Sequence, residues 1–107
     1  MRVALIQMLV TADKAANLRS ACEKIRAAKQ AGADIAVLPE MFCCSYENRC
    51  FRAYGEEAGG EVQQTLSRLA AELNLYIVGG SIPELAGENV YNTSFVYGRD
   101  GQLLARH

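Results

Sequence analysis

The spacing of hydrophobic and polar positions changes along the chain, and each spacing predicts a different element. Val3 to Met8 is a nearly continuous apolar run, which is typical of a strand buried on both faces. From Lys14 to Gln30 apolar positions recur at helical intervals, with Asp13 placed as the N-cap and Gly32 just past the end. Ile35 to Leu38 is a second short apolar strand. A strand–helix–strand unit of this kind predicts that its two strands are parallel.

The second half of the chain predicts one more helix and then short strands. Met41 to Gly60 has no clean period, and a connection of this length is usually functional or carries short helices of its own. Glu61 to Leu73 carries the apolar stripe of a helix. Three further strands are predicted, at Leu75–Ile82, Val90–Tyr97 and Gln102–Ala105. Short turns between them, including Asp100-Gly101, indicate antiparallel hairpins, so we expect an α/β fold with a mixed sheet.

Composition and charge narrow the classes of partner. Half of the 107 residues are hydrophobic, 21% are charged, and the formal net charge is −1 without any block of like charges. Nothing in this distribution indicates a surface for nucleic acid or for an anionic membrane. Met1 to Val10 is too short for a signal peptide, and no stretch approaches the ~20 apolar residues of a membrane span. We therefore expect a cytoplasmic protein.

The four cysteines have a spacing that suits neither a disulfide framework nor a zinc site. Cys43 and Cys44 are neighbours, Cys50 follows soon after, and no C-x-x-C pair occurs. The only histidine is His107, at the end of the chain. Free thiols in a reducing compartment are the expectation. Cys22 falls inside the first helical pattern and is predicted to be a core residue.

The segment with the clearest chemical meaning is Leu38-Pro39-Glu40-Met41. Pro39 fixes its own φ and keeps Leu38 extended, which places Glu40 rigidly at the carboxyl end of a strand. Open α/β sheets bind their ligands at that end. Apolar neighbours such as Met41 and Phe42 would desolvate the carboxylate and make it a useful general base near neutral pH. The residues alone leave open a surface glutamate that merely follows a strand-ending proline.

Several segments in the same order resemble the nitrilase superfamily of carbon–nitrogen hydrolases. They are Arg2–Gln7, Ala31–Phe42, Tyr76–Glu84, Tyr91–Thr93 and the Asp100-Gly101 turn. The resemblance covers essentially all 107 residues, and Ser81–Glu84 with Tyr91–Thr93 is most similar to the ω-amidase-like branch. It implies a four-layer αββα sandwich. Residues 1–107 would then be the N-terminal part of one hydrolase domain that continues past His107.

The resemblance also implies the chemistry, which is hydrolysis of a small carboxylic-acid amide to the acid and ammonia by a Cys–Glu–Lys triad. No metal or organic cofactor takes part. Only Glu40 carries over to this chain, because no lysine follows Lys29 and the family's nucleophilic cysteine lies further along. Phe42 and Tyr46 occupy positions that line the pocket mouth in similar proteins, although loop packing would also explain them. A homodimer or larger homo-oligomer is implied as well.

Other interpretations remain beside this one. The chain could be a catalytically inactive nitrilase-like fragment or binding module that uses an exposed sheet edge. Cys43 and Cys44 follow Glu40 closely but lie in the wrong motif for a nucleophile. A nucleotide-binding domain is disfavoured because Val10–Asp13, after the first strand, contains no glycine. Asn92 is expected to be structural and His107 to be exposed and inert, and the chain alone is expected to be inactive.

Overall fold

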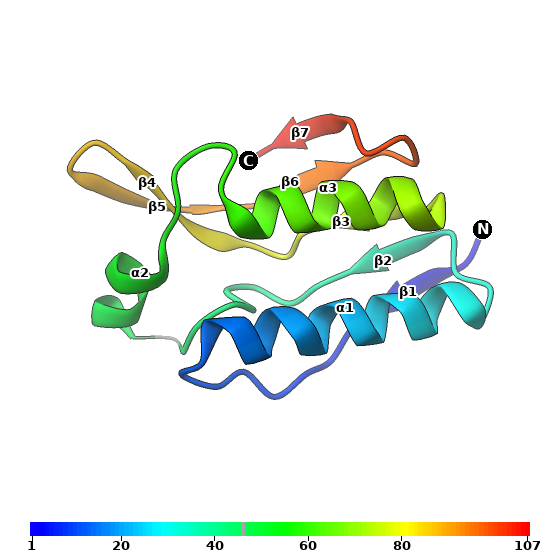
Figure 1. Ribbon diagram of the computed structural model, residues 1–107, viewed down its shortest axis with the longest axis horizontal. Coiled ribbons are helices and arrows are strands. Elements are labelled where there is room, and N and C mark those ends of the chain that lie inside the picture. Colours follow the sequence, from blue (N-terminus) through cyan, green and yellow to red (C-terminus); the bar gives the residue numbers. More distant parts are fainter. Residues whose placement is uncertain (46) are drawn as a thin grey trace.

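The computed structural model describes residues 1–45 and 47–107, and it contains two long helices that cover one face of a five-stranded sheet (Figure 1). The helices are α1 (Lys14–Gln30) and α3 (Glu61–Leu73). The sheet has the order β1 (Val3–Leu5), β2 (Ile35–Val37), β3 (Tyr76–Val78), β6 (Phe95–Tyr97) and β7 (Leu103–Arg106). At one end lie the two-stranded sheet of β4 (Ile82–Ala86) and β5 (Asn89–Thr93) and the short helix α2 (Asn48–Tyr54).

The sheet is mixed, as the sequence predicts. Strands β1, β2 and β3 are parallel, with Val3 opposite Ile35 and Ile35 opposite Tyr76. Strands β6 and β7 continue the sheet in the antiparallel sense. The carboxyl ends of β2 and β3 therefore lie side by side, at the same end of the sheet. None of the described helices has the length and apolar character that crossing a membrane requires.

Both long helices begin and end at the predicted residues because their end signals are local. The Asp13 carboxylate accepts a hydrogen bond of 3.0 Å from the Ala16 amide and so caps the start of α1. Gly32 follows the end of α1 with φ +93°, a conformation that glycine adopts without strain. Asn74 ends α3 in the left-handed conformation, with φ +52°. The connection from Met41 to Gly60, for which the sequence allows short helices, contains the short helix α2.

The hydrophobic core lies between the two helices and one face of the sheet. Ala36 and Ile77, on β2 and β3, point into it and meet Ile25 of α1 and Leu66 of α3, and all four are buried. Alternate residues of a strand point to opposite faces, so only every second strand residue reaches this core. Phe42 is fully buried in the same cluster.

The prediction that Val3 to Met8 forms a strand buried on both faces is wrong. The strand is shorter, Val3 to Leu5, and it lies at the edge of the sheet. Ala4 packs against the core, whereas Val3 and Leu5 are 54% and 76% exposed on the opposite face. A run of apolar residues fits this edge strand because the sheet face away from the helices is itself apolar.

Two predicted continuous strands are each broken into two. Leu75–Ile82 separates into β3 and β4, and Val90–Tyr97 separates into β5 and β6. The break after β3 occurs where Gly80 has φ +42° and its amide turns back to the Val78 carbonyl, at 2.8 Å. Beyond this bend, β4 and β5 leave the main sheet and pair only with each other, from Ile82 opposite Thr93 onward.

Candidate active site

A polar pocket of about 330 Å³ lies beyond the carboxyl ends of β2 and β3, two inner strands of the sheet. It is lined by Glu40, Gly80, Ser81, Asn92, Ser94 and His107. These residues come from four places in the chain: the turn after β2, the bend between β3 and β4, the β5–β6 junction and the residue after β7. The structure therefore brings the predicted catalytic residue together with hydroxyl, amide and imidazole groups that lie far from it in sequence.

The turn that carries Glu40 is fixed on both sides by the bend after β3. Leu38 continues the ladder, donating its amide to the Val78 carbonyl at 3.0 Å, before Pro39 ends the strand. Met41 then adopts φ +51°, and its amide donates a buried hydrogen bond of 3.1 Å to Ser81 Oγ. The chain path around Glu40 is thus set by contacts between two neighbouring parallel strands.

The Glu40 side chain is exposed, while the next two residues, Met41 and Phe42, are buried. The prediction that Met41 and Phe42 desolvate this carboxylate is therefore wrong in the part of the chain that the structure describes. The chain turns directly after Glu40, where Met41 has φ +51°. Glu40 lines the pocket, whereas Met41 and Phe42 are buried.

The other predicted site residues lie in different places. Phe42 packs in the core, so its role as a substrate contact stays a prediction. Tyr46, the second predicted substrate contact, lies outside the described residues. Asn92, expected to be structural, is exposed on β5 and lines the pocket. His107 is exposed as predicted, and it also lines the pocket.

The cysteines that follow Glu40 are poor nucleophiles in this structure. Cys43 and Cys44 are each 1% exposed. Burial raises the pKa of the Cys43 thiol to about 12, and burial also raises the pKa of Cys44. Because the thiolate is the reactive form, both thiols are protonated and shielded near neutral pH. Cys22 lies at the border of the core rather than within it, in a groove between α1 and α3.

An ion pair between a buried carboxylate and a half-exposed arginine holds the end of β7 next to the pocket. The Glu84 carboxylate is buried on β4, where it accepts a hydrogen bond of 3.0 Å from Thr93 Oγ1. Arg106 of β7 forms a salt bridge with the same carboxylate. Ser94 and His107 exchange backbone hydrogen bonds of 2.8 and 2.9 Å. These contacts place His107, the residue that follows β7, in the lining of the pocket that Glu40 also lines.

Sequence reasoning missed Gly80 and Ser81 as members of the site, although a signal for them exists. Glu40 follows one predicted strand, and Gly80-Ser81 follows the hydrophobic residues of the next parallel strand. Residues that directly follow neighbouring parallel strands lie close together at the carboxyl ends of those strands, so Glu40 and Gly80-Ser81 are expected to be close in space. The missed step was to end β3 at Val78 instead of running it through both glycines.

Comparison with known proteins gives consistent matches over nearly the whole chain. The family model described as carbon–nitrogen hydrolase matches residues 2–107. The omega-amidase NIT2 of Xenopus tropicalis is 44% identical over 106 residues, and that of Bos taurus is 45% identical over 106 residues. Each alignment covers 99% of this chain but 38% of the relative, so the chain spans less than half of their length.

Solved structures show the same architecture. The crystal structure of Nit3 from Saccharomyces cerevisiae, a member of branch 10 of the nitrilase superfamily, matches with a TM-score of 0.89 and 35% identity. That match covers 98% of this chain and 42% of Nit3. An amidase from Nesterenkonia sp. shares the fold with a TM-score of 0.79 and 22% identity, over 100% of this chain and 41% of the amidase. The predicted nitrilase-type fold is confirmed.

Proposed function

Since the family match spans residues 2–107, the chain belongs to the carbon–nitrogen hydrolase family, and we propose that it supplies the general base, Glu40, of an amidase. One observation carries the proposal: Glu40 extends from a rigidly held turn into a polar pocket at the carboxyl ends of parallel strands. The similarity to omega-amidases supports a small carboxylic-acid amide as the substrate. The products would be the carboxylic acid and ammonia.

The catalytic groups of the proposed reaction are shared between this chain, which supplies the base, and a cysteine and a lysine that it does not contain. Glu40 would take the proton from a cysteine thiol, and the thiolate would attack the amide carbon. The carbon–nitrogen bond breaks as ammonia leaves with the proton that Glu40 took, and water then hydrolyses the thioester to release the acid and restore the thiol. A lysine and nearby donors would stabilise the negative charge that develops on the amide oxygen.

The described residues support assigning the lysine and the cysteine to another part of the native protein. No lysine follows Lys29 in this chain, and the two cysteines nearest Glu40 are buried thiols with raised pKa values. The isolated chain is therefore proposed to be inactive. The Ser94 hydroxyl and the Asn92 amide line the same pocket and would orient the substrate. Phe42 and Tyr46 stay predicted contacts of the substrate.

The wider properties of the protein are proposals as well. We place it in the cytoplasm as a homodimer or larger homo-oligomer that acts without a metal or organic cofactor. Neither nucleic acid nor a membrane is proposed as a partner, which is consistent with a net charge of −1 and evenly mixed charges.

A second candidate function is a catalytically inactive binding module, and the open face of the sheet favours it. Val3 and Leu5 expose apolar side chains on the face of one edge strand that lies away from the helices, and Leu104 exposes its side chain on the opposite edge strand. Unpaired strand edges with apolar side chains are prone to association with another chain. In this case the fold would serve as a docking surface and Glu40 would have no chemical role.

The two functions are separated by isolating the native protein that carries this chain, sequencing its peptides and measuring ammonia release from small carboxylic-acid amides. The amidase proposal predicts a downstream lysine and cysteine, activity in the native protein, and loss of activity in Glu40→Gln. Glu88→Gln is the matched control, because it removes one carboxylate from the exposed turn between β4 and β5. Activity that survives in Glu40→Gln overturns the proposal. A native protein without the lysine and the cysteine favours the binding module.

A further inference from the structure

We propose that Ser81 is a positioning residue that holds Glu40 in its working orientation by accepting the hydrogen bond from the Met41 amide. The inference rests on the proposed role of Glu40 as general base. It adds a residue from the bend between β3 and β4 that acts through the backbone and not on the substrate.

The first observation is the backbone of Met41, which has φ +51°. This left-handed conformation crowds the Cβ of any residue other than glycine, and such residues adopt it only where their surroundings hold them. Met41 directly follows Glu40, and its own side chain is buried in the interior. If Met41 relaxed to the ordinary extended or helical region, the peptide plane after Glu40 would rotate and the carboxylate would leave its present position.

The second observation is the partner that holds this turn. Ser81 is buried, and its Oγ accepts the Met41 amide hydrogen at 3.1 Å. A buried amide without an acceptor is strongly disfavoured, so this hydrogen bond stabilises the left-handed conformation over its alternatives. The contact joins residues forty positions apart in sequence and is therefore a feature of the folded pocket.

The third observation is that the peptide before Glu40 is fixed by the residue next to Ser81. A Cβ added to Gly80 would lie 2.0 Å from the Pro39 carbonyl oxygen and 2.8 Å from the Leu38 carbonyl oxygen. The two backbones therefore pack closely. Gly80 packs against the chain on the amino side of Glu40, and Ser81 accepts a hydrogen bond from it on the carboxyl side.

This double restraint matters because a general base acts only within hydrogen-bond reach of the proton that it removes. A displacement of about 1 Å in such a group lowers the rate by roughly a hundredfold. Loss of the Ser81 hydroxyl would leave the Glu40 carboxylate chemically intact but less often in place. The effect should therefore fall on kcat, with little change in KM.

The test compares Ser81→Ala with Ser67→Ala in the native protein that carries this chain. Ser67 is the matched control because its hydroxyl also bonds a backbone group, donating to the Gly101 carbonyl at 2.6 Å, outside the set of residues that lines the Glu40 pocket. Two measurements are made: the kinetics of ammonia release, which give kcat and KM, and the hydrogen-exchange rate of the Met41 amide. Labelling with ¹⁵N-methionine reports the second, and Met41→Leu identifies the signal.

We expect Ser81→Ala to lower kcat at least tenfold, to change KM less than threefold and to speed Met41 amide exchange at least tenfold. Ser67→Ala should change none of the three quantities, kcat, KM and the Met41 exchange rate, by more than twofold. A Ser81→Ala protein with unchanged Met41 exchange, or with fast exchange and a kcat within twofold of the wild type, overturns the inference. If the unmutated native protein releases no ammonia, the amidase proposal fails, and Met41 exchange still decides whether Ser81 holds the turn.

Discussion

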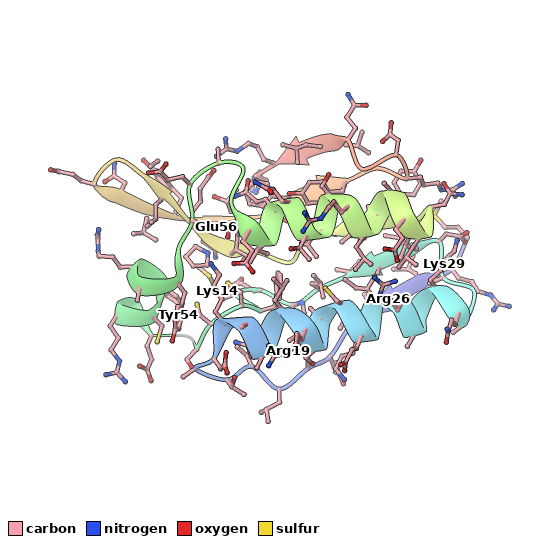
Figure 2. All side chains as sticks on the ribbon, viewed as in Figure 1. Lys14, Arg19, Arg26, Lys29, Tyr54 and Glu56 are labelled. Carbon is pink, nitrogen blue, oxygen red and sulfur yellow. The ribbon has the colours of Figure 1, made fainter. Side chains whose placement is uncertain are left out.

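The Glu56 carboxylate contacts the N-termini of both long helices. Its removal should therefore lower the free energy of unfolding by an amount that can be worked out from these contacts. Glu56 is 9% exposed and accepts hydrogen bonds of 3.0 Å from the amides of both Val62 and Gln63, in the first turn of α3. Lys14, the first residue of α1, faces it at 3.3 Å (Figure 2). A carboxylate at this position satisfies free amides and also interacts favourably with the helix dipole.

Glu56→Gln should destabilise the fold by ~3 kcal/mol. The substitution replaces one carboxylate oxygen by an NH₂ group that faces donors, so one hydrogen bond to the start of α3 is lost. Hydrogen bonds to charged groups contribute ~1.5–3 kcal/mol, and the ion pair with Lys14 is lost as well. With an unfolding entropy of about 2.1 cal/mol/K per residue, the midpoint of thermal unfolding should fall by about 13 °C.

The assay is urea and thermal unfolding of the purified chain, followed by far-ultraviolet circular dichroism. Glu57→Gln is the control, because this neighbouring carboxylate is exposed and its neutralisation should change stability by less than about 0.5 kcal/mol. Lys14→Met should cost only ~1 kcal/mol, since the Lys14 side chain is 22% exposed and water screens the pair. The reasoning is refuted if Glu56→Gln is as stable as the wild type, or if Glu57→Gln loses as much stability.

Three other predictions concern different parts of the chain. Burial raises the pKa of both Cys43 and Tyr97 to about 12, so the folded state keeps protons that the unfolded chain loses, and stability should fall as the pH rises from about 9 toward 12. Equal urea midpoints at about pH 8 and about pH 11 would contradict this. Arg106→Met leaves the buried Glu84 carboxylate without its cation and should lower the free energy of unfolding in urea by ~2 kcal/mol. This value is smaller than that of a fully buried pair because Arg106 is half exposed. A loss below about 0.5 kcal/mol would refute this prediction. Gly80→Ala places a Cβ 2.0 Å from a backbone carbonyl oxygen at φ +42° and should destabilise by ~3 kcal/mol or more; an unchanged melting temperature would disprove the close contact.

The features that could be predicted from sequence are those with local causes. The bounds of α1 and α3 follow from an apolar stripe and from end signals such as Asp13, all within a few residues of each other. The parallel pairing of β1 and β2 follows from the long helical crossover that connects them. The placement of Glu40 after a strand-ending proline is local in the same sense.

The features that could not be predicted depend on contacts between distant segments. The exposure of Leu5 depends on which strand forms the edge and on which face the helices cover, and no window around residue 5 contains that information. Glu40 is exposed beside two buried apolar residues in a turn where Met41 has a left-handed backbone, and the Met41 amide bonds Ser81 from a distant segment of the chain. A non-glycine residue in that conformation has no sequence signal, so the apolar neighbours suggested burial where the fold produces exposure.

The central claim, that Glu40 is the general base of a carbon–nitrogen hydrolase, is tested most directly by single-turnover ammonia release. The native protein that carries this chain is mixed in excess with a small carboxylic-acid amide, and the first release of ammonia is timed for the wild type and for Glu40→Gln. Without its base, the attacking thiol stays protonated, and general-base catalysis contributes about 10²–10⁴ to the rate. We predict a release at least about a hundredfold slower in Glu40→Gln. A single-turnover rate in Glu40→Gln equal to that of the wild type would contradict the account.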